Sequence, residues 1–139
     1  MLTQTAEYAL RAVLLVAREP GGGPVGAARL AGVLGIPRNY LSKTLHQLGR
    51  SRVLVSTRGK NGGFRLARPA GEISLIEVVA PFDEVSTRRY CLLGRTTCSD
   101  QSPCAAHARW KGVAERIGDI FRETTVADLG QDGGRLGRL

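Results

Sequence analysis

The apolar residues among the first fifty positions recur every three or four residues in three successive segments. This spacing predicts a helix over residues 4–17, a second over 26–34 and a third over 37–50. Three glycines and a proline at 21–24 separate the first two helices, and Gly35 allows a tight turn between the second and the third. Two short helices joined by a glycine turn, each with an apolar stripe, form the pattern of a helix-turn-helix.

The next segment has the pattern of a β-hairpin. Residues 53–55 and 64–67 are short runs typical of strands, and the glycine-rich stretch between them, 58–63, favours a tight turn. A hairpin that directly follows the second helix of a helix-turn-helix is a wing. A short helix is expected after it, over residues 75–79.

Residues 81–104 show no periodic pattern and hold all the cysteines, whereas residues 104–122 return to helical spacing. The apolar stripe of this long helix consists of Trp110, Val113, Ile117, Ile120 and Phe121. The stripe is too apolar to leave in water, so we interpret it as the seam of a homodimer, with packing inside one chain as the alternative. Thr125 and Asp128 predict a capping box for a last turn at 126–129.

These elements predict a mainly α fold with a small β-hairpin, a winged helix-turn-helix plus a long C-terminal dimerisation helix. The expected parts are a DNA-binding domain at 1–80, a cysteine-bearing loop at 81–104, the dimerisation helix and last turn at 104–129, and a mobile tail at 130–139.

The net charge of +8 is unevenly distributed along the chain. Residues 20–71 contain nine lysines and arginines and no acidic residue, so the remainder of the chain carries a net charge of −1. Such segregation costs stability through self-repulsion and is usual where the partner is a polyanion, whereas a merely solvated basic surface interleaves both signs. We therefore predict that double-stranded DNA is the partner.

The third helix offers the residues that would read the DNA, which are Arg38, Asn39, Tyr40, Ser42, Lys43 and Gln47. The first turns of a recognition helix reach base edges in the major groove, which favours Arg38, Asn39 and Ser42 as base readers. Tyr40 is equally well explained as a packed helix residue.

Other cations are better suited to the DNA backbone. We expect phosphate contacts from Lys43, Arg50 and Arg52. The wing residues Arg58, Gly59 and Lys60 are expected at the minor groove or its rim, although the wing glycines are equally explained by a tight hairpin alone.

Several other classes of protein fit the sequence poorly. No apolar run approaches the roughly 18 residues that span a bilayer, and Glu7 and Arg11 inside the first helix argue against a signal peptide. We expect a cytoplasmic protein without a membrane contact. Paired carboxylates, a phosphate-binding glycine loop and a Ser-His-Asp set do not stand out, so an enzyme is not predicted. A metal-binding adaptor without DNA binding is the alternative of a different class.

The three cysteines, Cys91, Cys98 and Cys104, lie in one short segment with His107 close behind. Clustered cysteines without a secreted disulfide framework favour a metal or redox role. We expect Cys104 beside the start of the long helix and His107 one turn further on the same face. Three thiolates and a nitrogen suit an iron–sulfur cluster or zinc, with free thiols or a disulfide switch as further alternatives.

A family resemblance is carried by four segments: LTQTAEYALRAV, LAGVLGIPRNYLSKTLHQLGRSRVL, RGKNGGFRLARP and TTVADL. Together with the three-cysteine loop, they resemble the IscR/NsrR family, or Rrf-two family, through Leu129. The resemblance implies a winged helix-turn-helix homodimer crossed through the long C-terminal helix. Many members bind an iron–sulfur cluster through the loop cysteines.

By this resemblance Cys91, Cys98 and Cys104 match the three family cysteines. His107 matches the histidine ligand of the regulator of cluster assembly, which holds a 2Fe–2S centre. Glu7 lies where the nitric-oxide-sensing branch places an acidic ligand to its 4Fe–4S cluster, donated by the partner subunit.

We favour His107 and a 2Fe–2S cluster, with Glu7 and a 4Fe–4S cluster, or zinc, as alternatives. The six-residue gap between Cys91 and Cys98 is one longer than in many members, so the cluster type stays open. Glu7 is also placed to form an i,i+4 ion pair with Arg11.

The resulting hypothesis is a transcription regulator that senses redox state, nitric oxide or iron–sulfur status. The cluster would order the loop and set the angle between two DNA-binding heads on a near-palindromic operator.

Overall fold

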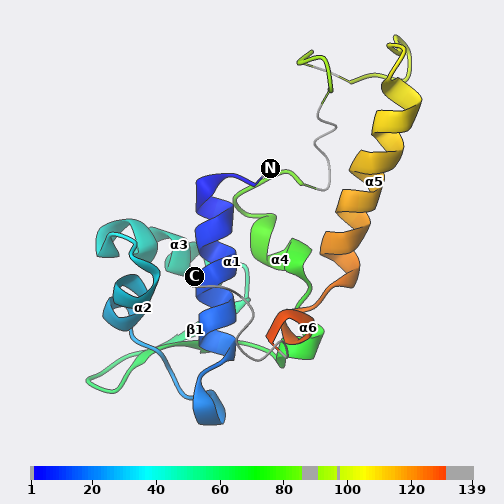
Figure 1. The fold of residues 1–139 in the computed structure, drawn as a ribbon. Helices are drawn as coiled ribbons and strands as arrows, with labels where there is room; N and C mark the ends of the chain where they lie inside the picture. Colours follow the sequence, from blue (N-terminus) through cyan, green and yellow to red (C-terminus); the bar gives the residue numbers. More distant parts are fainter. Residues whose placement is uncertain (1, 86–90, 97, 131–139) are drawn as a thin grey trace.

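The computed structural model describes residues 2–85, 91–96 and 98–130. Its helices and strands are α1 (Gln4–Ala17), α2 (Ala27–Leu34), α3 (Arg38–Arg50), β1 (Leu54–Thr57), β2 (Gly63–Leu66), α4 (Leu75–Val79), α5 (His107–Glu123) and α6 (Val126–Gly130), with short 3-10 turns at Pro20–Gly22 and Ala70–Glu72 (Figure 1). The mainly α fold with one hairpin is confirmed, and every predicted element lies within two residues of its expected bounds except α5.

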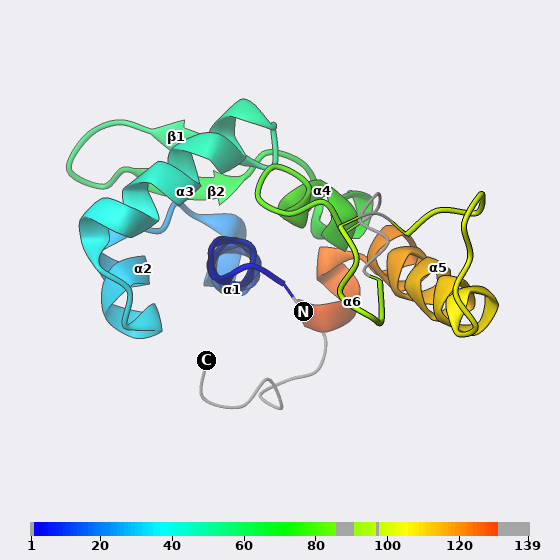
Figure 2. The ribbon, with the colours of Figure 1, turned by 90° about the horizontal axis from the view of Figure 1, so that it is seen from above.

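Helix α1 is the central element of the fold. The side chains of Ala6, Ala9 and Ala12 on it are fully buried, and such small residues let neighbouring helices approach closely. Seen from above, α1 is viewed end-on between α2 and α3 on one side and α4 and α6 on the other (Figure 2). The helix begins at a capping contact, because the Thr3 hydroxyl accepts a hydrogen bond from the Ala6 N–H at 3.2 Å.

Helices α2 and α3 form the predicted helix-turn-helix. Gly35 ends α2 with a φ of +65°, a left-handed conformation that glycine adopts without a Cβ clash. Ile36 then enters the core, and the facing apolar stripes of the two helices are buried. These stripes consist of Leu30, Ala31 and Leu34 on α2 and Leu41, Leu45 and Leu48 on α3.

The wing is an antiparallel hairpin that is tied to the body at its base. Strands β1 and β2 pair from Leu54 opposite Leu66 to Thr57 opposite Gly63. Val25, in the connection before α2, exchanges two backbone hydrogen bonds of 2.8 Å with Phe64. A Cβ on Gly62 would overlap the carbonyl oxygen of Thr57, so this glycine is required by the hairpin itself.

Helices α4 and α6 close the other side of the core. The Leu75 N–H donates to the Thr124 carbonyl and the Val126 N–H to the Ile73 carbonyl, both at 2.9 Å, which joins the two segments. The predicted capping box of α6 is confirmed: the Thr125 N–H donates to Asp128 at 2.8 Å, and the Asp128 N–H donates to the Thr125 hydroxyl at 3.2 Å.

The predicted start of α5 at Cys104 is wrong, because the helix begins at His107. The His107 N–H donates to the Cys104 carbonyl at 2.9 Å, a hydrogen bond across three residues that makes a turn instead of a helical start. Cys104 therefore lies on the turn that precedes the helix, and His107 is the first residue of the helix.

The apolar stripe of α5 is divided between two environments. Phe121 is buried against the core, whereas Val113 and Ile120 are each 48% exposed. Helix α5 contacts α4 near its C-terminal end, and its other end projects past the body and carries the cysteine loop (Figure 1). The predicted mobile tail lies outside the described residues apart from Gly130. Within residues 2–85, 91–96 and 98–130, no helix has both the length and the apolarity needed to cross a membrane.

Candidate DNA-binding surface and cysteine loop

The outward face of α3 presents most of the predicted DNA-reading residues to solvent. Arg38, Asn39, Tyr40 and Lys43 are exposed, and Ser42 and Gln47 are half-buried. The Ser42 hydroxyl donates to the Arg38 carbonyl at 2.8 Å, so it is engaged within the helix.

Tyr40 is also engaged within the protein. Its hydroxyl lies 2.6 Å from the Thr5 hydroxyl, and its ring meets that of Tyr8 edge-on with 5.7 Å between the ring centroids. Such an edge-to-face pair stabilises by about 0.5–1.5 kcal/mol beyond burial. These contacts favour Tyr40 as a packed residue that holds α3 against α1.

The end of α3 is a Schellman motif with an arginine at its left-handed position. The Arg52 N–H donates to Gly49 and the Val53 N–H to Leu48, and Arg52 itself has a φ of +61°. Among the described residues, Arg52 is the only residue other than glycine that has a positive φ. Glycine avoids the cost of this conformation, which is about 1 kcal/mol for other residues. An exposed arginine at this position points to a use for its side chain.

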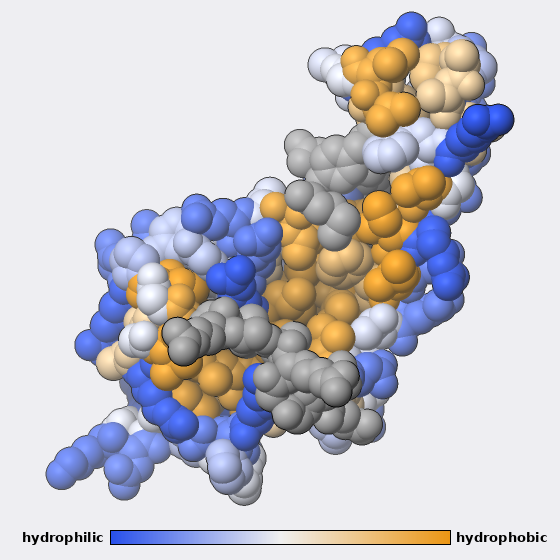
Figure 3. Space-filling view, in the orientation of Figure 1, coloured by the Kyte–Doolittle hydropathy of each residue, from blue (hydrophilic) through white to orange (hydrophobic). Residues whose placement is uncertain are grey.

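The basic segment keeps most of its cations unpaired. Within it, Arg29 pairs with Glu19 at 2.8 Å and Arg68 with Glu77 at 2.7 Å. Across the part of the chain that the structure describes, no ion pair is formed by Arg38, Lys43, Arg50, Arg52, Arg58, Lys60 or Arg65. The exposed turn with Arg58, Gly59 and Lys60 forms the tip of the projecting wing, the hydrophilic extension at the lower left of Figure 3. Helix α3 and the wing thus present unpaired positive charge to solvent, a property that binding of DNA phosphates would require.

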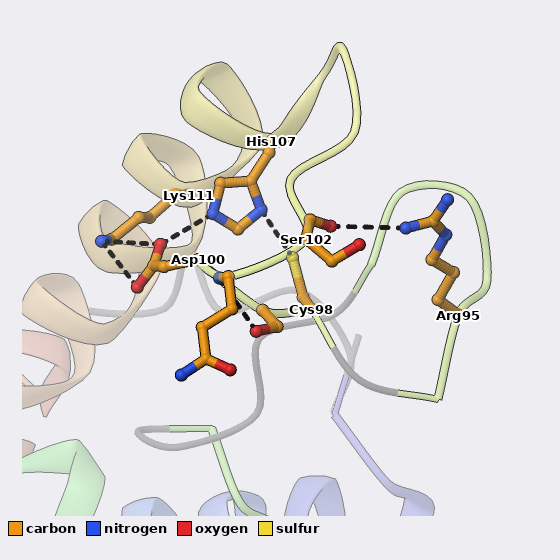
Figure 4. A network of polar contacts seen from close by, with 8 residues as sticks. Arg95, Cys98, Asp100, Ser102, His107 and Lys111 are labelled. Carbon is orange, nitrogen blue, oxygen red and sulfur yellow. Dashed lines mark hydrogen bonds and ion pairs between the residues drawn. The ribbon is translucent and has the colours of Figure 1, made fainter.

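The cysteine loop docks on the first turns of α5 through His107 (Figure 4). The His107 side chain is buried, with Nδ1 3.3 Å from the Cys98 sulfur and Nε2 2.8 Å from the Asp100 carboxylate. Lys111, one turn along α5, contacts both oxygens of the same carboxylate at 3.2 and 3.3 Å. Sequence reasoning missed Asp100 and Lys111; the available signal was the i,i+4 spacing of His107 and Lys111.

Cys91 lies next to Cys98 in this loop. The pKa of the Cys91 thiol is lowered because backbone N–H groups of Arg95 and Leu93 donate hydrogen bonds to its sulfur, helped by the Arg95 charge and by a hydrogen bond with Cys98, while burial opposes the shift. A lowered pKa favours the thiolate, the form in which cysteine binds metals.

The predicted ligands are brought together only in part. Cys91 meets Cys98 and Cys98 meets His107, and no disulfide joins the three cysteines. Cys104 is half-buried on the turn that precedes α5. Among the residues described, no three histidine, cysteine or acidic side chains lie close enough to hold a metal ion.

The sequence profile of the Rrf2 family, described as "Iron-dependent Transcriptional regulator", matches residues 2–132 of this chain. The chain is 31% identical over 128 residues to the HTH-type transcriptional regulator IscR of Cronobacter sakazakii, covering 92% of this chain and 78% of the relative. The chain belongs to the Rrf2 family.

Solved structures of similar fold include Rrf2 regulators with different names. CymR, the global cysteine regulator of B. subtilis, matches with a TM-score of 0.79 at 18% identity, over 94% of this chain and 95% of that chain. IscR of T. potens matches with a TM-score of 0.73 at 21% identity, over 93% of this chain and 85% of that chain. These likenesses confirm the winged helix-turn-helix fold.

Family membership makes the protein a DNA-binding transcriptional regulator and not an enzyme, as predicted. Glu7, the alternative to His107 as the predicted fourth ligand, is exposed on the first turn of α1. The alternative ion pair between Glu7 and Arg11 is absent from the ion pairs of the described residues.

Proposed function

We propose that this Rrf2 regulator is a cytoplasmic homodimer that binds a near-palindromic operator and senses redox state, nitric oxide or iron–sulfur status through a cluster held by its cysteine loop. The observation that carries the proposal is the 3.3 Å contact between the Cys98 sulfur and His107 Nδ1. In this contact, an imidazole nitrogen of α5 faces a thiol of the cysteine loop.

The side chains present fit a soft metal centre. Cys91, Cys98 and Cys104 offer three thiols from one loop, and His107 offers a nitrogen of a buried ring. Thiolate and imidazole donors suit an iron–sulfur cluster, and they also suit zinc. A bound cluster would supply reversible electron transfer and reactivity toward nitric oxide. We favour a 2Fe–2S cluster with His107 as the fourth ligand, and the partner subunit's Glu7 with a 4Fe–4S cluster is the alternative.

The dimer is proposed to form along α5. Val113 and Ile120 leave an apolar strip in solvent, and Leu92 and Leu93 of the loop are 56% and 64% exposed. Apolar surface gathers where α5 faces the body (Figure 3). A hollow of about 430 Å³ adjoins the strip, lined by Leu92, Ala105, Ala106, Arg109, Trp110 and Val113. A twofold pair of chains joined here would present two copies of α3 to successive turns of the DNA major groove.

A chain of contacts links the loop to the recognition helix. Asp83, buried near the start of the 81–104 segment, accepts the Thr3 N–H at 2.6 Å. Two residues further, the Thr5 hydroxyl meets Tyr40 on α3. We propose that a change in the order of the loop is passed to α1, and from there to α3, through these contacts, as a two-state response requires.

The test uses the full chain purified without oxygen. Its visible spectrum and its iron, sulfide and zinc contents are measured first. Fluorescence anisotropy at one fixed salt concentration then gives the affinity of cluster-loaded and cluster-free protein for a duplex selected by this protein from a random library. We expect a brown protein with iron and sulfide, and two different affinities for the same duplex.

Substitutions identify the ligands in the same assay. Cys98→Ser is expected to abolish cluster binding, whereas Thr96→Ala, an exposed neighbour in the same loop, is expected to leave it intact. A colourless protein containing zinc would overturn the cluster and leave a zinc regulator. Equal affinities with and without the cluster would overturn sensing while leaving DNA binding in place.

A further inference from the structure

Both ring nitrogens of His107 have defined partners, which is informative for a side chain only 7% exposed. Nε2 faces the Asp100 carboxylate at 2.8 Å, and Nδ1 faces the Cys98 sulfur at 3.3 Å. Asp100 is itself held from the other side by the Lys111 ammonium. Figure 4 shows the ring between Cys98 and Asp100, with Lys111 beyond the carboxylate.

These partners decide which nitrogen carries the hydrogen. An ionised carboxylate only accepts hydrogen bonds, so the nitrogen that faces Asp100 must be the donor. In the neutral ring, Nδ1 is then left with its lone pair directed at the Cys98 sulfur. The opposite tautomer would place the Nε2 lone pair against the oxygens of Asp100.

We propose that Asp100, held by Lys111, is a positioning residue that keeps His107 in its Nε2–H tautomer and so offers Nδ1 to a centre bound at Cys98. The tautomer itself does not depend on any cofactor, whereas its use in ligation rests on the proposed function. A histidine that binds a metal commonly donates its other N–H to a carboxylate, which fixes the ring and raises its basicity.

The contact also explains how an irregular loop is docked on a helix. Asp100 lies between Cys98 and Cys104, and its two partners are one turn apart on α5. An exposed ion pair alone would add little, but here the acceptor also satisfies a nitrogen of a buried ring. The test must therefore separate control of the tautomer from simple docking of the loop.

The first experiment measures the tautomer in the cluster-free, reduced full chain. Long-range proton–nitrogen correlation spectra of ¹⁵N-histidine-labelled protein at about pH 8, above the ordinary histidine pKa, distinguish the two tautomers. The chain has only two histidines, so a His46→Gln variant assigns the signals. We expect His107 to show a protonated Nε2 and an unprotonated Nδ1.

Matched variants then test the role of Asp100. Asp100→Glu retains a carboxylate, which only accepts hydrogen bonds, and should retain the Nε2–H tautomer, whereas Asp100→Ala should give a mixture of tautomers. Gln101→Ala, an exposed neighbour, should change nothing. A wild-type His107 protonated at Nδ1, or an Asp100→Ala variant with an unchanged tautomer, would overturn the inference.

The second experiment examines ligation in protein reconstituted with iron and sulfide without oxygen. Samples labelled with ¹⁵N only at Nδ1 or only at Nε2 of histidine are reduced and studied by pulsed electron paramagnetic resonance. We expect strong nitrogen coupling from the Nδ1 label, lost in His107→Ala, and cluster retention about 10- to 100-fold weaker in Asp100→Ala. Strong coupling from Nε2 instead, or full retention in Asp100→Ala, would contradict the positioning role.

The two experiments separate the two proposals. If the wild-type protein takes up no iron and sulfide, the proposed function fails, while the tautomer spectra still decide the role of Asp100. If the cluster binds but the tautomer does not respond to Asp100, the positioning role fails alone.

Discussion

The hydroxyl groups of Thr5 and Tyr40 lie 2.6 Å apart and join the first turn of α1 to the first turn of α3. The Tyr8 ring packs edge-on against the same tyrosine. A residue on α3, the proposed recognition helix, is thereby anchored to the helix at the centre of the fold, so the orientation of α3 depends on α1.

Removing this hydroxyl contact should weaken the fold slightly. Tyr40→Phe keeps the ring pair and loses the hydrogen bond, which we expect to lower the free energy of unfolding by about 0.5–1 kcal/mol because the pair is solvent-exposed. Urea denaturation measures the change. In a double-mutant cycle with Thr5→Val, the combined loss should be smaller than the sum of the two single losses. Strictly additive losses would show that the hydroxyl pair is not formed in solution.

The left-handed arginine at the end of α3 predicts opposite changes in stability and DNA binding. Arg52→Gly removes the conformational cost and should raise the free energy of unfolding by about 1 kcal/mol. It also removes a cation, so DNA affinity should fall for all sequences, with the logarithmic salt slope reduced by about 1. Chemical denaturation and anisotropy titrations over a range of salt concentrations measure the two effects.

Arg52→Ala is the matched control for this prediction. It deletes the same charge but keeps a Cβ in the left-handed region, so it should lose DNA affinity without gaining stability. Unchanged DNA affinity in both variants would remove Arg52 from the binding surface.

The exposed apolar strip on α5 predicts that charge will separate the subunits. The double substitution Val113→Asp and Ile120→Asp should convert a dimer to a monomer, because two carboxylates would be buried without partners in the interface. Light scattering coupled to gel filtration measures the mass. Glu115→Ala, which helical periodicity places on the opposite face, should remain dimeric. If the double variant is still a dimer, the seam lies elsewhere.

At the start of α4 the Glu77 carboxylate accepts a hydrogen bond from the Ser74 N–H at 2.9 Å, and this cap predicts a stability that depends on pH. Burial alone raises the pKa of Glu77, but hydrogen bonds from the Ser74 N–H, the Arg68 side chain and the Ser74 hydroxyl outweigh it, and the pKa lies below its ordinary value of 4.5. Because the folded-state pKa is lowered, the stabilisation is fully present above the unfolded-state pKa and is lost as pH falls through the folded-state pKa.

Thermal unfolding checks this dependence. Glu77→Gln should melt at a lower temperature than the wild type near neutral pH, and the difference should shrink in acid as the wild-type carboxylate is protonated. A difference that stays constant from neutral to acidic pH would mean that the carboxylate charge has no part in the cap.

The sequence predicted the elements that depend on local chemistry. Apolar spacing and Gly35 sufficed for α2 and α3, because the periodicity of a helix and the conformational freedom of glycine are local properties. The start of α5 was placed too early. Pro103, directly before the predicted start, is typical of the first turn of a helix, whereas Cys104 makes a turn with His107.

The geometry of the cysteine loop could not be predicted from patterns in the sequence. The position of Asp100 relative to His107 depends on how an irregular segment folds back on a helix, and no periodicity encodes that path. The role of Tyr40 was open for a similar reason, since a tyrosine on an outward helix face fits either DNA or a neighbouring helix until the neighbour is known.

The two hydrogen bonds between Val25 and Phe64 tie the wing to the segment that leads into the helix-turn-helix. The distance from the recognition helix to the wing within one subunit is then set by covalent and β-sheet geometry. We expect any signal received by the protein to leave the preferred bases of each half-site unchanged. What should vary with the signal is the number of base pairs tolerated between the half-sites.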